Sequence, residues 1–475
     1  EDPFTPVPAP DWHAASAALE QTLGAFPSDT PLAKIRSGIS DVCCGTAGGF
    51  PGIYTLTVPT GGGKTLASLR FAIEHAKQFG MEHIFYVIPF NTILDQNSAD
   101  IRGALKDTIS ILEHHGGVVF DENTAEGETE NYKRLTARWT SALVLTSMVK
   151  FLDAFYGAKR ADARRMCHLS NSVIIFDEIQ ALPKKCTRIF EKAVQFLVDV
   201  CGCTVVFCTA TQPQLEVKPK PKEIIPDTSM LFDELCRTKI IDESASAKTC
   251  QDAAREVLAL IERHGSVLMI VNTKRMARRL FELVSTEGVP SAYLTTDMYP
   301  AHRMERIKEI KTRGSGPFFC VSTALIEAGI NISFPCVVRS MASLGSILQA
   351  AGRCNRNAEL PEGVLGEVHI WELAEESLRG LQEISAAKEC TAGLLKSEYA
   401  SNLNCPKAID AYYTNEREKF NELLPYPVTT SGVSTSILKL FGKNEAAASG
   451  AGSKLRLRGA YRTGQELFKV ISSDT

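Results

Sequence analysis

The chain has 475 residues, of which 44% are hydrophobic and 23% charged, with a net charge of −3. This composition is ordinary for a globular protein, and the length allows several domains of roughly 100–200 residues each. The near-neutral charge excludes a protein-wide basic field, so any contact with nucleic acid must come from a local groove. No apolar run reaches the roughly 18–20 residues of a membrane span, and no secretory signal is present, which argues against a membrane partner.

The first 50 residues are rich in Pro, Ala and Ser, with helical patterns around Leu19–Leu23 and Leu32–Val42. We interpret residues 1–50 as an N-terminal linker and helical segment. The chain begins with Glu1 rather than Met, and E-D-P-F-T-P-V-P-A-P is typical of a linker. The sequence is therefore expected to be a fragment of something longer.

From Tyr54 onward, short apolar runs alternate with amphipathic stretches, which predicts parallel strands joined by crossover helices. A Pro- and Lys-rich break at residues 212–228 separates two blocks of comparable length, so we expect two lobes with a cleft between them. The predicted first lobe spans 51–215, the second 216–385, and a small C-terminal extension 386–475. The expected strands are the runs Y-T-L-T-V, H-I-F-Y-V-I-P, S-A-L-V-L-T, S-V-I-I-F-D-E, T-V-V-F-C-T-A, S-V-L-M-I-V-N-T, P-F-F-C-V-S-T, C-V-V-R-S-M-A and G-E-V-H-I-W-E-L.

The C-terminal extension contains a segment, residues 443–455, with the composition of a flexible linker. A basic patch follows it, and a solvated surface is a better interpretation of this patch than a phosphate contact. The patch comprises Lys454, Arg456, Arg458 and Arg462.

The fourteen cysteines contain no C-x-x-C pair, since the closest spacings are Cys43-Cys44 and Cys201-Gly202-Cys203. A zinc ribbon is therefore excluded. Several cysteines lie in apolar runs, where a free thiol behaves as a small core hydrophobe. We expect a reducing, cytoplasmic compartment.

A phosphate-binding loop is predicted where the strand run Y-T-L-T is followed by V-P-T-G-G-G-K-T and then by a helical pattern. Glycines allow backbone N–H groups to turn inward, and a helix N-terminus adds positive potential. In this pattern Lys64 reaches the β- and γ-phosphates of ATP, and the Thr65 hydroxyl binds Mg²⁺. The first position is Val58 instead of the usual Gly. The predicted ATP-binding residues are Pro59, Thr60, Gly61, Gly62, Gly63, Lys64 and Thr65.

The second half of an ATPase site is an apolar strand that ends in carboxylates, and V-I-I-F-D-E supplies it. We expect Asp177 to hold Mg²⁺ and Glu178 to polarise the attacking water. Ile179 and Gln180 complete a D-E-I-Q box. About 30 residues later, Thr209 and Thr211 of the T-A-T segment are candidates for sensing the γ-phosphate and coupling it to the other lobe.

The box Q-A-A-G-R-C-N-R, residues 349–356, carries two arginines three positions apart. We expect Arg353 and Arg356 to lie on one face of a helix and to reach a developing negative charge on the γ-phosphate. Lys64, Glu178, Arg353 and Arg356 are the predicted catalytic residues.

In order, T-V-P-T-G-G-G-K-T, D-E-I-Q, T-A-T-Q-P, S-T-A-L-I-E-A-G-I-N-I-S-F and Q-A-A-G-R-C-N-R resemble the motifs of superfamily 2 helicases. The D-E-I-Q, I-E-A-G and G-R-C-N-R boxes are similar to the helicase portion of the helicase–nuclease of type I CRISPR interference. The resemblance covers roughly residues 50–375. It implies an α/β fold of two tandem recombinase-type ATPase lobes, ATP and Mg²⁺ as cofactors, single-stranded DNA as substrate, 3'-to-5' movement and docking on an RNA-guided surveillance complex.

The resemblance also implies roles for individual residues. Gly329 and Asn331 would contact the nucleotide, and Gln349 would join Thr209 and Thr211 in coupling. The segments that would meet the DNA backbone lie at predicted strand ends, which suits sequence-independent phosphate binding. Their members are Pro89, Asn91, Thr146 and Ser147 in the first lobe, and Asn272, Thr273, Ser322 and Thr323 in the second.

The sequence departs from this family in three places. Asn331 and Ser333 stand where acids are usual after I-E-A-G. No Gln precedes the phosphate loop to read adenine, and Arg36 is a weak substitute. None of the nine histidines is followed by Asp, so we expect the metal-dependent nuclease domain of the family to be missing or separate.

Two other functions stay open at this stage. One is a different superfamily 2 motor, either an RNA helicase or the translocating subunit of a restriction system. The other is an ATP-responsive docking module that does not move along nucleic acid. Glu178 and Arg356 argue against the second, because both serve hydrolysis.

Overall fold

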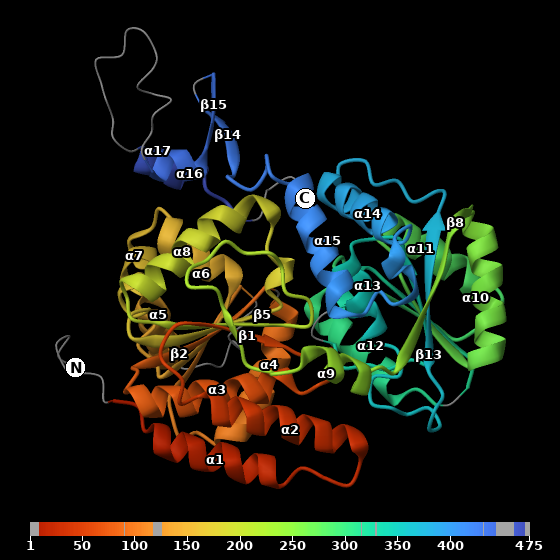
Figure 1. The fold of residues 1–475 in the computed structure, drawn as a ribbon. Coiled ribbons are helices and arrows are strands. Elements are labelled where there is room, and N and C mark those ends of the chain that lie inside the picture. Colours follow the sequence, from red (N-terminus) through yellow and green to blue (C-terminus); the bar gives the residue numbers. More distant parts are fainter. Residues whose placement is uncertain are drawn as a thin grey trace. The chain divides into compact units, whose positions relative to one another are not determined.

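The computed structural model describes residues 9–89, 91–116, 126–314, 316–327, 330–430, 432–442 and 460–470. Its contacts divide the chain into two compact units. Unit 1 comprises Glu1–Val58, Gly63–Pro226 and Arg417–Thr475, and unit 2 comprises Pro59–Gly62 and Asp227–Glu416. Each unit is built around a parallel sheet with helices packed against it, which confirms the predicted α/β class (Figure 1). The contacts divide the predicted C-terminal extension between the units, since it belongs to unit 2 up to Glu416 and to unit 1 from Arg417 onward. The four segments predicted from the sequence remain a proposal.

The sheet of unit 1 has the strand order β3-β4-β2-β5-β6-β1-β7, and every neighbouring pair is parallel. Strands β2, β5 and β6 are buried along their whole length, because helices cover both faces of a parallel sheet. The strands are β1 Ile53–Thr57, β2 His83–Ile88, β3 Ile111–His114, β4 Leu143–Ser147, β5 Ser172–Asp177, β6 Thr204–Thr209 and β7 Lys222–Glu223.

The helices of unit 1 include two that precede the first strand. Helices α1 and α2 pack on α3, so the predicted helical segment before the first strand is part of this unit (Figure 1). The far C-terminal elements share a hydrophobic core with α6 and α8. The helices are α1 Trp12–Gly24, α2 Pro31–Thr46, α3 Lys64–Phe79, α4 Asn91–Leu105, α5 Glu126–Arg138, α6 Met148–Tyr156, α7 Arg160–Cys167, α8 Thr187–Asp199, α16 Ile437–Phe441 and α17 Tyr461–Leu467, with the hairpin β14 Pro427–Thr430 and β15 Val433–Ser436 and the 3₁₀ turns η1 Ile179–Ala181 and η2 Lys184–Cys186.

The sheet of unit 2 has the order β10-β11-β9-β12-β13-β8 and is also parallel throughout its described strands. Its strands are β8 Thr238–Lys248, β9 Ser266–Ile270, β10 Ser291–Leu294, β11 Phe318–Ser322, β12 Cys336–Ser340 and β13 Gly366–Leu373. Its helices are α9 Thr228–Glu234, α10 Cys250–His264, α11 Lys274–Ser285, α12 Pro300–Thr312, α13 Leu344–Ala351 and α14 Gln382–Leu394, the 3₁₀ turns η3 Ala324–Ile326 and η4 Glu398–Ser401, and α15 Pro406–Lys419, whose last residues are grouped with unit 1.

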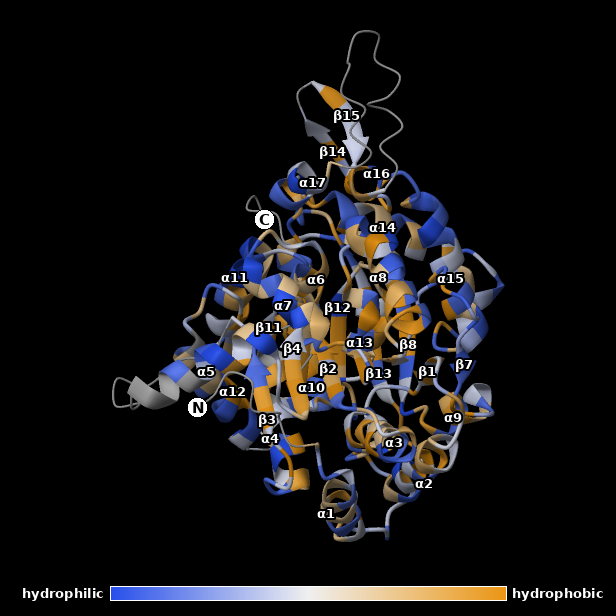
Figure 2. Cartoon of the chain, turned by 90° about the vertical axis from the view of Figure 1, so that its left-hand side faces the viewer, coloured by the Kyte–Doolittle hydropathy of each residue, from blue (hydrophilic) through white to orange (hydrophobic). Residues whose placement is uncertain are grey.

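All nine strands predicted from apolar runs are present, and the Pro- and Lys-rich break contains the boundary at Pro226. Figure 2 shows why these strands were visible in the sequence, since a central strand such as β2 is largely hydrophobic. In the two parallel sheets, three strands of four or more residues were missed, namely β3, β8 and β10. All three are edge strands; β3 and β10 are short, and β8 is mostly polar, with no fully buried residue along it. No helix in the described part of the chain is both long and apolar enough to cross a membrane.

Candidate nucleotide and nucleic-acid sites

The predicted phosphate loop connects the buried strand β1 to helix α3, which begins at Lys64. Gly63 occupies the N-cap position with φ of 81°, and Gly61 has φ of 88°, a region that residues with a side chain rarely adopt. The loop therefore requires glycine at these two positions to bring backbone N–H groups round to a phosphate. Arg36 of α2 lies beside the loop, because its Cγ is 3.4 Å from where a Cβ on Gly63 would stand.

Lys64 forms an ion pair with Glu178, and its Nζ lies 3.0 Å from the carboxylate Oε1. Both side chains are largely buried. Burial lowers the pKa of Lys64, but the charges of Glu178 and Asp177 outweigh this effect, and the pKa is raised overall. The lysine is therefore a fixed cation that faces both carboxylates of the D-E-I-Q box.

Glu178 itself has a left-handed backbone, with φ of 51° and ψ of 44°. A residue with a side chain adopts this conformation at a cost on the order of 1 kcal/mol, and such strain is commonest at functional sites. The turn directs the Glu178 side chain back toward Lys64, immediately after β5 ends at Asp177. The strained backbone at Glu178 therefore brings its carboxylate to the Lys64 ammonium group.

Gln180 joins the D-E-I-Q box to the T-A-T segment. Its amide Nε2 donates to Glu178 Oε2, and its Oε1 accepts a hydrogen bond from the Thr209 hydroxyl. The same hydroxyl oxygen accepts from the backbone N–H of Thr211 at 3.0 Å. The structure therefore brings Lys64, Glu178, Thr209 and Thr211 into one connected network, with Gln180 as the link that the sequence did not single out.

Asp177 is buried at the end of β5, beside the hydroxyl of Tyr86 from β2, which lies 3.3 Å from its Oδ2. Burial and the neighbouring Glu178 charge raise the pKa of Asp177, while Lys64 and the Tyr86 hydroxyl oppose the shift. The other oxygen, Oδ1, has no hydrogen-bond partner among the described residues. A buried carboxylate oxygen of this kind fits Mg²⁺, which prefers oxygen ligands and is commonly held by one or two carboxylates together with substrate phosphates.

No group of three or more His, Cys, Asp or Glu side chains in the described ranges could hold a metal ion by itself. The site at Asp177 differs from such a cluster, because a nucleotide would supply most of the oxygens.

The nucleic-acid candidates of unit 1 lie at or just after the ends of the adjacent parallel strands β2 and β4, so they lie at the same edge of the sheet. Pro89 is half-buried, whereas the side chain of Asn91 lies outside the described residues. The Thr146 hydroxyl is buried and donates to the carbonyl of His114 at 2.8 Å. Ser147 caps α6, whose Lys150 N–H donates to its hydroxyl oxygen. These hydroxyls are engaged within the unit, and the helix N-terminus behind Ser147 offers backbone amides.

The candidates of unit 2 lie at or just after the ends of β9 and β11, which are likewise adjacent and parallel. Thr273 caps α11. The carboxylate of Glu376 accepts hydrogen bonds from the backbone N–H groups of Asn272 and Thr273 at 2.7 and 3.0 Å, and from Asn272 Nδ2 at 2.9 Å. An anion of the chain itself thus occupies the amides at which a phosphate was expected. Ser322 is fully buried, its hydroxyl lying 2.8 Å from the Leu294 carbonyl, and Thr323 starts the next turn.

The predicted helical placement of Arg353 and Arg356 is wrong. Helix α13 ends at Ala351, with Gly352 as its C-cap, and Asn355 turns the chain with φ of 45°. Arg353 is 3% exposed, and its guanidinium donates to the carbonyls of Ile326 and Glu327. The two arginines therefore have different surroundings instead of sharing one helical face.

Arg356 is half-buried in the turn after α13. Its Nε donates to Asn331 Oδ1 at 2.9 Å, and its Nη1 donates to the Gly352 carbonyl. Asn331, expected at the nucleotide, thus lies beside the arginine expected at the γ-phosphate. Gln349 is partly exposed on α13, whereas Gly329 lies outside the described residues.

Two parts of this chain match sequence profiles of known protein families. Residues 41–218 match the sequence profile of the DEAD/DEAH box helicases, and residues 263–359 match that of the C-terminal region of the CRISPR-associated nuclease/helicase Cas3. Over these two segments the chain is similar to superfamily 2 helicases of the Cas3 kind. The two profiles cover the phosphate loop, the D-E-I-Q box, the T-A-T segment and the G-R-C-N-R box of this helicase.

A CRISPR-associated nuclease/helicase Cas3 from Haloferax volcanii is 27% identical to this helicase over an alignment that covers 68% of the chain. The chain spans 47% of the length of that relative. Among solved structures, Cas3 of T. fusca with ADP has a TM-score of 0.67 at 16% identity, covering 87% of this chain and 57% of its own. A chain in a structure titled "CRISPR RNA-guided surveillance complex, pre-nicking" has a TM-score of 0.59 at 16% identity, covering 83% of this chain and 52% of its own.

Sequence reasoning missed three polar residues that the fold of this Cas3-like helicase places at the sites. Tyr86 was hidden inside the apolar run H-I-F-Y-V-I, where a phenol is an unusual core group and was the available signal. Gln180 stood in the D-E-I-Q box without an assigned role. Glu376 belonged to an acidic segment, E-L-A-E-E, that is typical of solvated surface, and no local signal pointed to the α11 amides.

Proposed function

We propose that this chain is an ATP-driven motor that moves along single-stranded DNA in the interference step of a type I CRISPR system. The observation that carries the proposal is the network of Lys64, Glu178, Gln180 and Thr209. It joins a phosphate loop, an acid pair and a coupling segment at one edge of one parallel sheet. An ATP-binding module that does not hydrolyse has no need of the strained Glu178 turn.

In the proposed mechanism, the phosphates of ATP attract Lys64 away from Glu178, because the phosphates and the Glu178 carboxylate then compete for one ammonium ion. The Glu178 carboxylate becomes available to orient the attacking water and accept its proton. Arg356 supplies positive charge to the transition state. When bound through Thr65 and Asp177 together with the phosphates, Mg²⁺ would neutralise charge on the phosphate oxygens.

The DNA contacts of the proposal are the strand-end residues and helix N-termini of each unit. In unit 1 they are Pro89, Asn91, Thr146 and Ser147, and in unit 2 they are Asn272, Thr273, Ser322 and Thr323. Their position after adjacent strands is the same in both sheets, because β4 and β2 in one correspond by order to β11 and β9 in the other. Backbone amides and small hydroxyls at such positions suit a phosphate backbone without base preference.

Single-stranded DNA, 3'-to-5' movement and docking on an RNA-guided surveillance complex belong to the proposal, and the Cas3 likeness supports them. A cytoplasmic location also belongs to it, because all fourteen cysteines are free, as is usual in a reducing compartment.

The test is ATP turnover measured with no nucleic acid, single-stranded DNA, single-stranded RNA and duplex DNA. We expect single-stranded DNA to stimulate turnover most strongly. Stronger stimulation by RNA would identify an RNA helicase, stronger stimulation by duplex DNA a restriction-type translocase, and no multiple-turnover hydrolysis a docking module. Strand displacement from duplexes with a 3' or a 5' overhang then tests the direction, and 3'-to-5' movement predicts activity on the 3' overhang only.

A further inference from the structure

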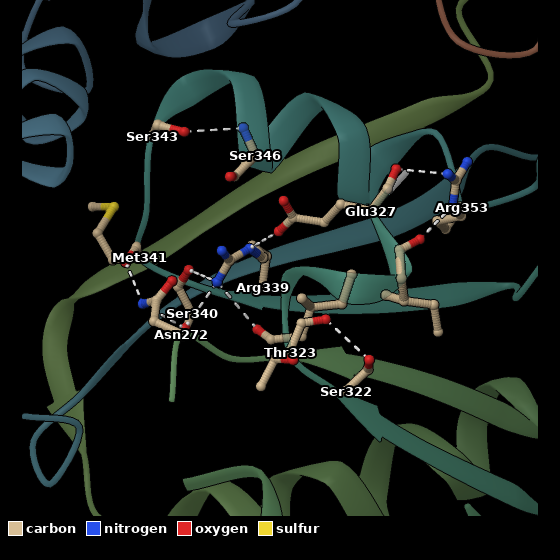
Figure 3. A network of polar contacts seen from close by, with 12 residues as sticks. Asn272, Ser322, Thr323, Glu327, Arg339, Ser340, Met341, Ser343, Ser346 and Arg353 are labelled. Carbon is tan, nitrogen blue, oxygen red and sulfur yellow. Dashed lines mark hydrogen bonds and ion pairs between the residues drawn. The ribbon is translucent and has the colours of Figure 1, made fainter. Parts of the chain in front are cut away.

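A fully buried ion pair lies in unit 2, and neither of its two residues has been assigned a role above. Arg339 on β12 and Glu327 in the turn after β11 are 1% and 5% exposed, and Arg339 Nε lies 2.8 Å from Glu327 Oε1 (Figure 3). Burying two charges costs desolvation energy that their attraction often fails to recover, so apolar side chains commonly stabilise a core as well or better. The pair therefore calls for an explanation other than stability.

On one side, the pair contacts the segment expected to bind DNA. Arg339 Nη1 donates to the Ser340 hydroxyl oxygen at 3.1 Å, and Asn272 Nδ2 donates to the same oxygen at 3.1 Å. Arg339 Nη1 also donates to the carbonyl of Ile270, the last residue of β9 and two positions before Asn272. The Asn272 side chain and this guanidinium thus share the Ser340 hydroxyl oxygen as their acceptor.

On the other side, the pair holds the segment expected to act on ATP. Arg353 Nη2 donates to the Glu327 carbonyl at 2.6 Å, and Arg353 Nε donates to Ile326 at 2.8 Å. The Ser346 side chain lies on α13, the helix that ends one residue before the Arg353 turn, and it favours the charged form of the Glu327 carboxylate. Burial raises the pKa of Glu327, while Arg339, Ser346 and Arg353 oppose the shift.

We propose that the Arg339–Glu327 pair positions Arg353, and through it the turn that carries Arg356, according to what is bound at Asn272. The proposal rests on the function proposed above and extends it, because it names positioning residues through which DNA binding would accelerate ATP hydrolysis. Both ends of the connection lie within unit 2 and consist of contacts between described residues (Figure 3).

The experiment compares the stimulation ratio, which is kcat with saturating single-stranded DNA divided by kcat without DNA. A variant that is merely less well folded loses both rates by the same factor, so its ratio stays constant. Glu327→Gln keeps the shape of the side chain and removes its charge, and we expect the ratio to fall by about 10-fold, within the range found for coupling networks. Ser346→Ala removes only the hydroxyl on α13 that favours the charged Glu327 carboxylate, and we expect a fall of roughly threefold.

Ser346→Ala also serves if Glu327→Gln fails to fold, because it leaves the buried ion pair intact. The matched control is Asp162→Asn, which neutralises the acid of another buried ion pair, with Arg165 in unit 1. This control is expected to lower the melting temperature and keep the ratio. An unchanged ratio in folded Ser346→Ala and Glu327→Gln proteins, or an equal fall in Asp162→Asn, overturns the proposal. If the wild-type ratio is about one, DNA does not stimulate ATP turnover. The proposed function then fails, and this inference fails with it.

Discussion

The Nζ of Lys64 lies 3.0 Å from Oε1 of Glu178, so the cation of the phosphate loop and the carboxylate expected to orient water are partners of each other. In the mechanism proposed above, a phosphate that binds Lys64 also releases Glu178 from this ion pair. ATP binding and preparation of the carboxylate for hydrolysis would then be one event.

Lys64→Ala is expected to lower ATP turnover by at least about 10³, since the phosphates lose the loop's cation at the transition state. The melting temperature should change little, because the pair is small compared with the core of unit 1. The measurement is steady-state ATP hydrolysis at saturating single-stranded DNA. Lys77→Ala is the control, since Lys77 lies on the same helix and pairs with Glu74. Near-wild-type turnover in Lys64→Ala would show that the loop is misassigned.

Replacing each arginine of the G-R-C-N-R box should have a different effect, because their surroundings differ. Arg356→Ala should leave ATP binding within a few-fold and lower kcat by about 10³, the scale for an arginine that stabilises transition-state charge. Arg353→Ala should chiefly destabilise unit 2 by about 2–3 kcal/mol, because two buried carbonyls lose a charged donor. Nucleotide binding, kcat and thermal melting distinguish the two outcomes. A loss of ATP binding with unchanged kcat in Arg356→Ala would place that residue in ground-state recognition instead.

Tyr86→Phe tests the assignment of Asp177 as the carboxylate that holds Mg²⁺. The Tyr86 hydroxyl lies 3.3 Å from Asp177 Oδ2 and favours the ionised form of this carboxylate. The substitution removes that hydroxyl. We expect the Mg²⁺ concentration at half-maximal ATP turnover to rise by roughly threefold, the scale of one weak hydrogen bond. Tyr54→Phe is a matched control, because Tyr54 is a buried tyrosine on β1 whose hydroxyl donates to a backbone carbonyl. Equal Mg²⁺ dependence in both variants would contradict a role for Tyr86 at the metal.

The strands and the motif positions were predictable because both depend on local patterns. An apolar run such as S-V-I-I-F-D reports its own burial, and the residues that follow such runs must meet at one edge of a parallel sheet. The sequence could not reveal which polar groups face each other across strands. Arg339 and Glu327 stand twelve positions apart in the chain, and their pairing depends on how β12 lies beside the turn after β11. The helical placement of Arg353 and Arg356 failed because Gly352 ends the helix.

Binding to single-stranded DNA should depend strongly on salt and weakly on base sequence. Each phosphate neutralised on a single strand lowers the slope of log K against log salt by roughly 0.7, whatever the bases. Fluorescence anisotropy with oligonucleotides of different composition, measured between low and physiological salt, gives the slope directly. Salt-insensitive binding with a marked base preference would be incompatible with contacts to the backbone at the strand ends.

The last prediction concerns Glu376, whose carboxylate accepts hydrogen bonds from the amides of Asn272 and Thr273. If these amides bind a DNA phosphate, the phosphate must displace this carboxylate or lie next to it. One unit of like charge about 4 Å away costs about 1 kcal/mol in water, so Glu376→Gln should tighten DNA binding roughly fivefold. Glu372→Gln is the control, because the carboxylate of this nearby glutamate pairs with Lys388 on α14. Equal or weaker binding by Glu376→Gln, compared with this control, would assign Glu376 to capping α11 and would move the DNA backbone away from Asn272 and Thr273.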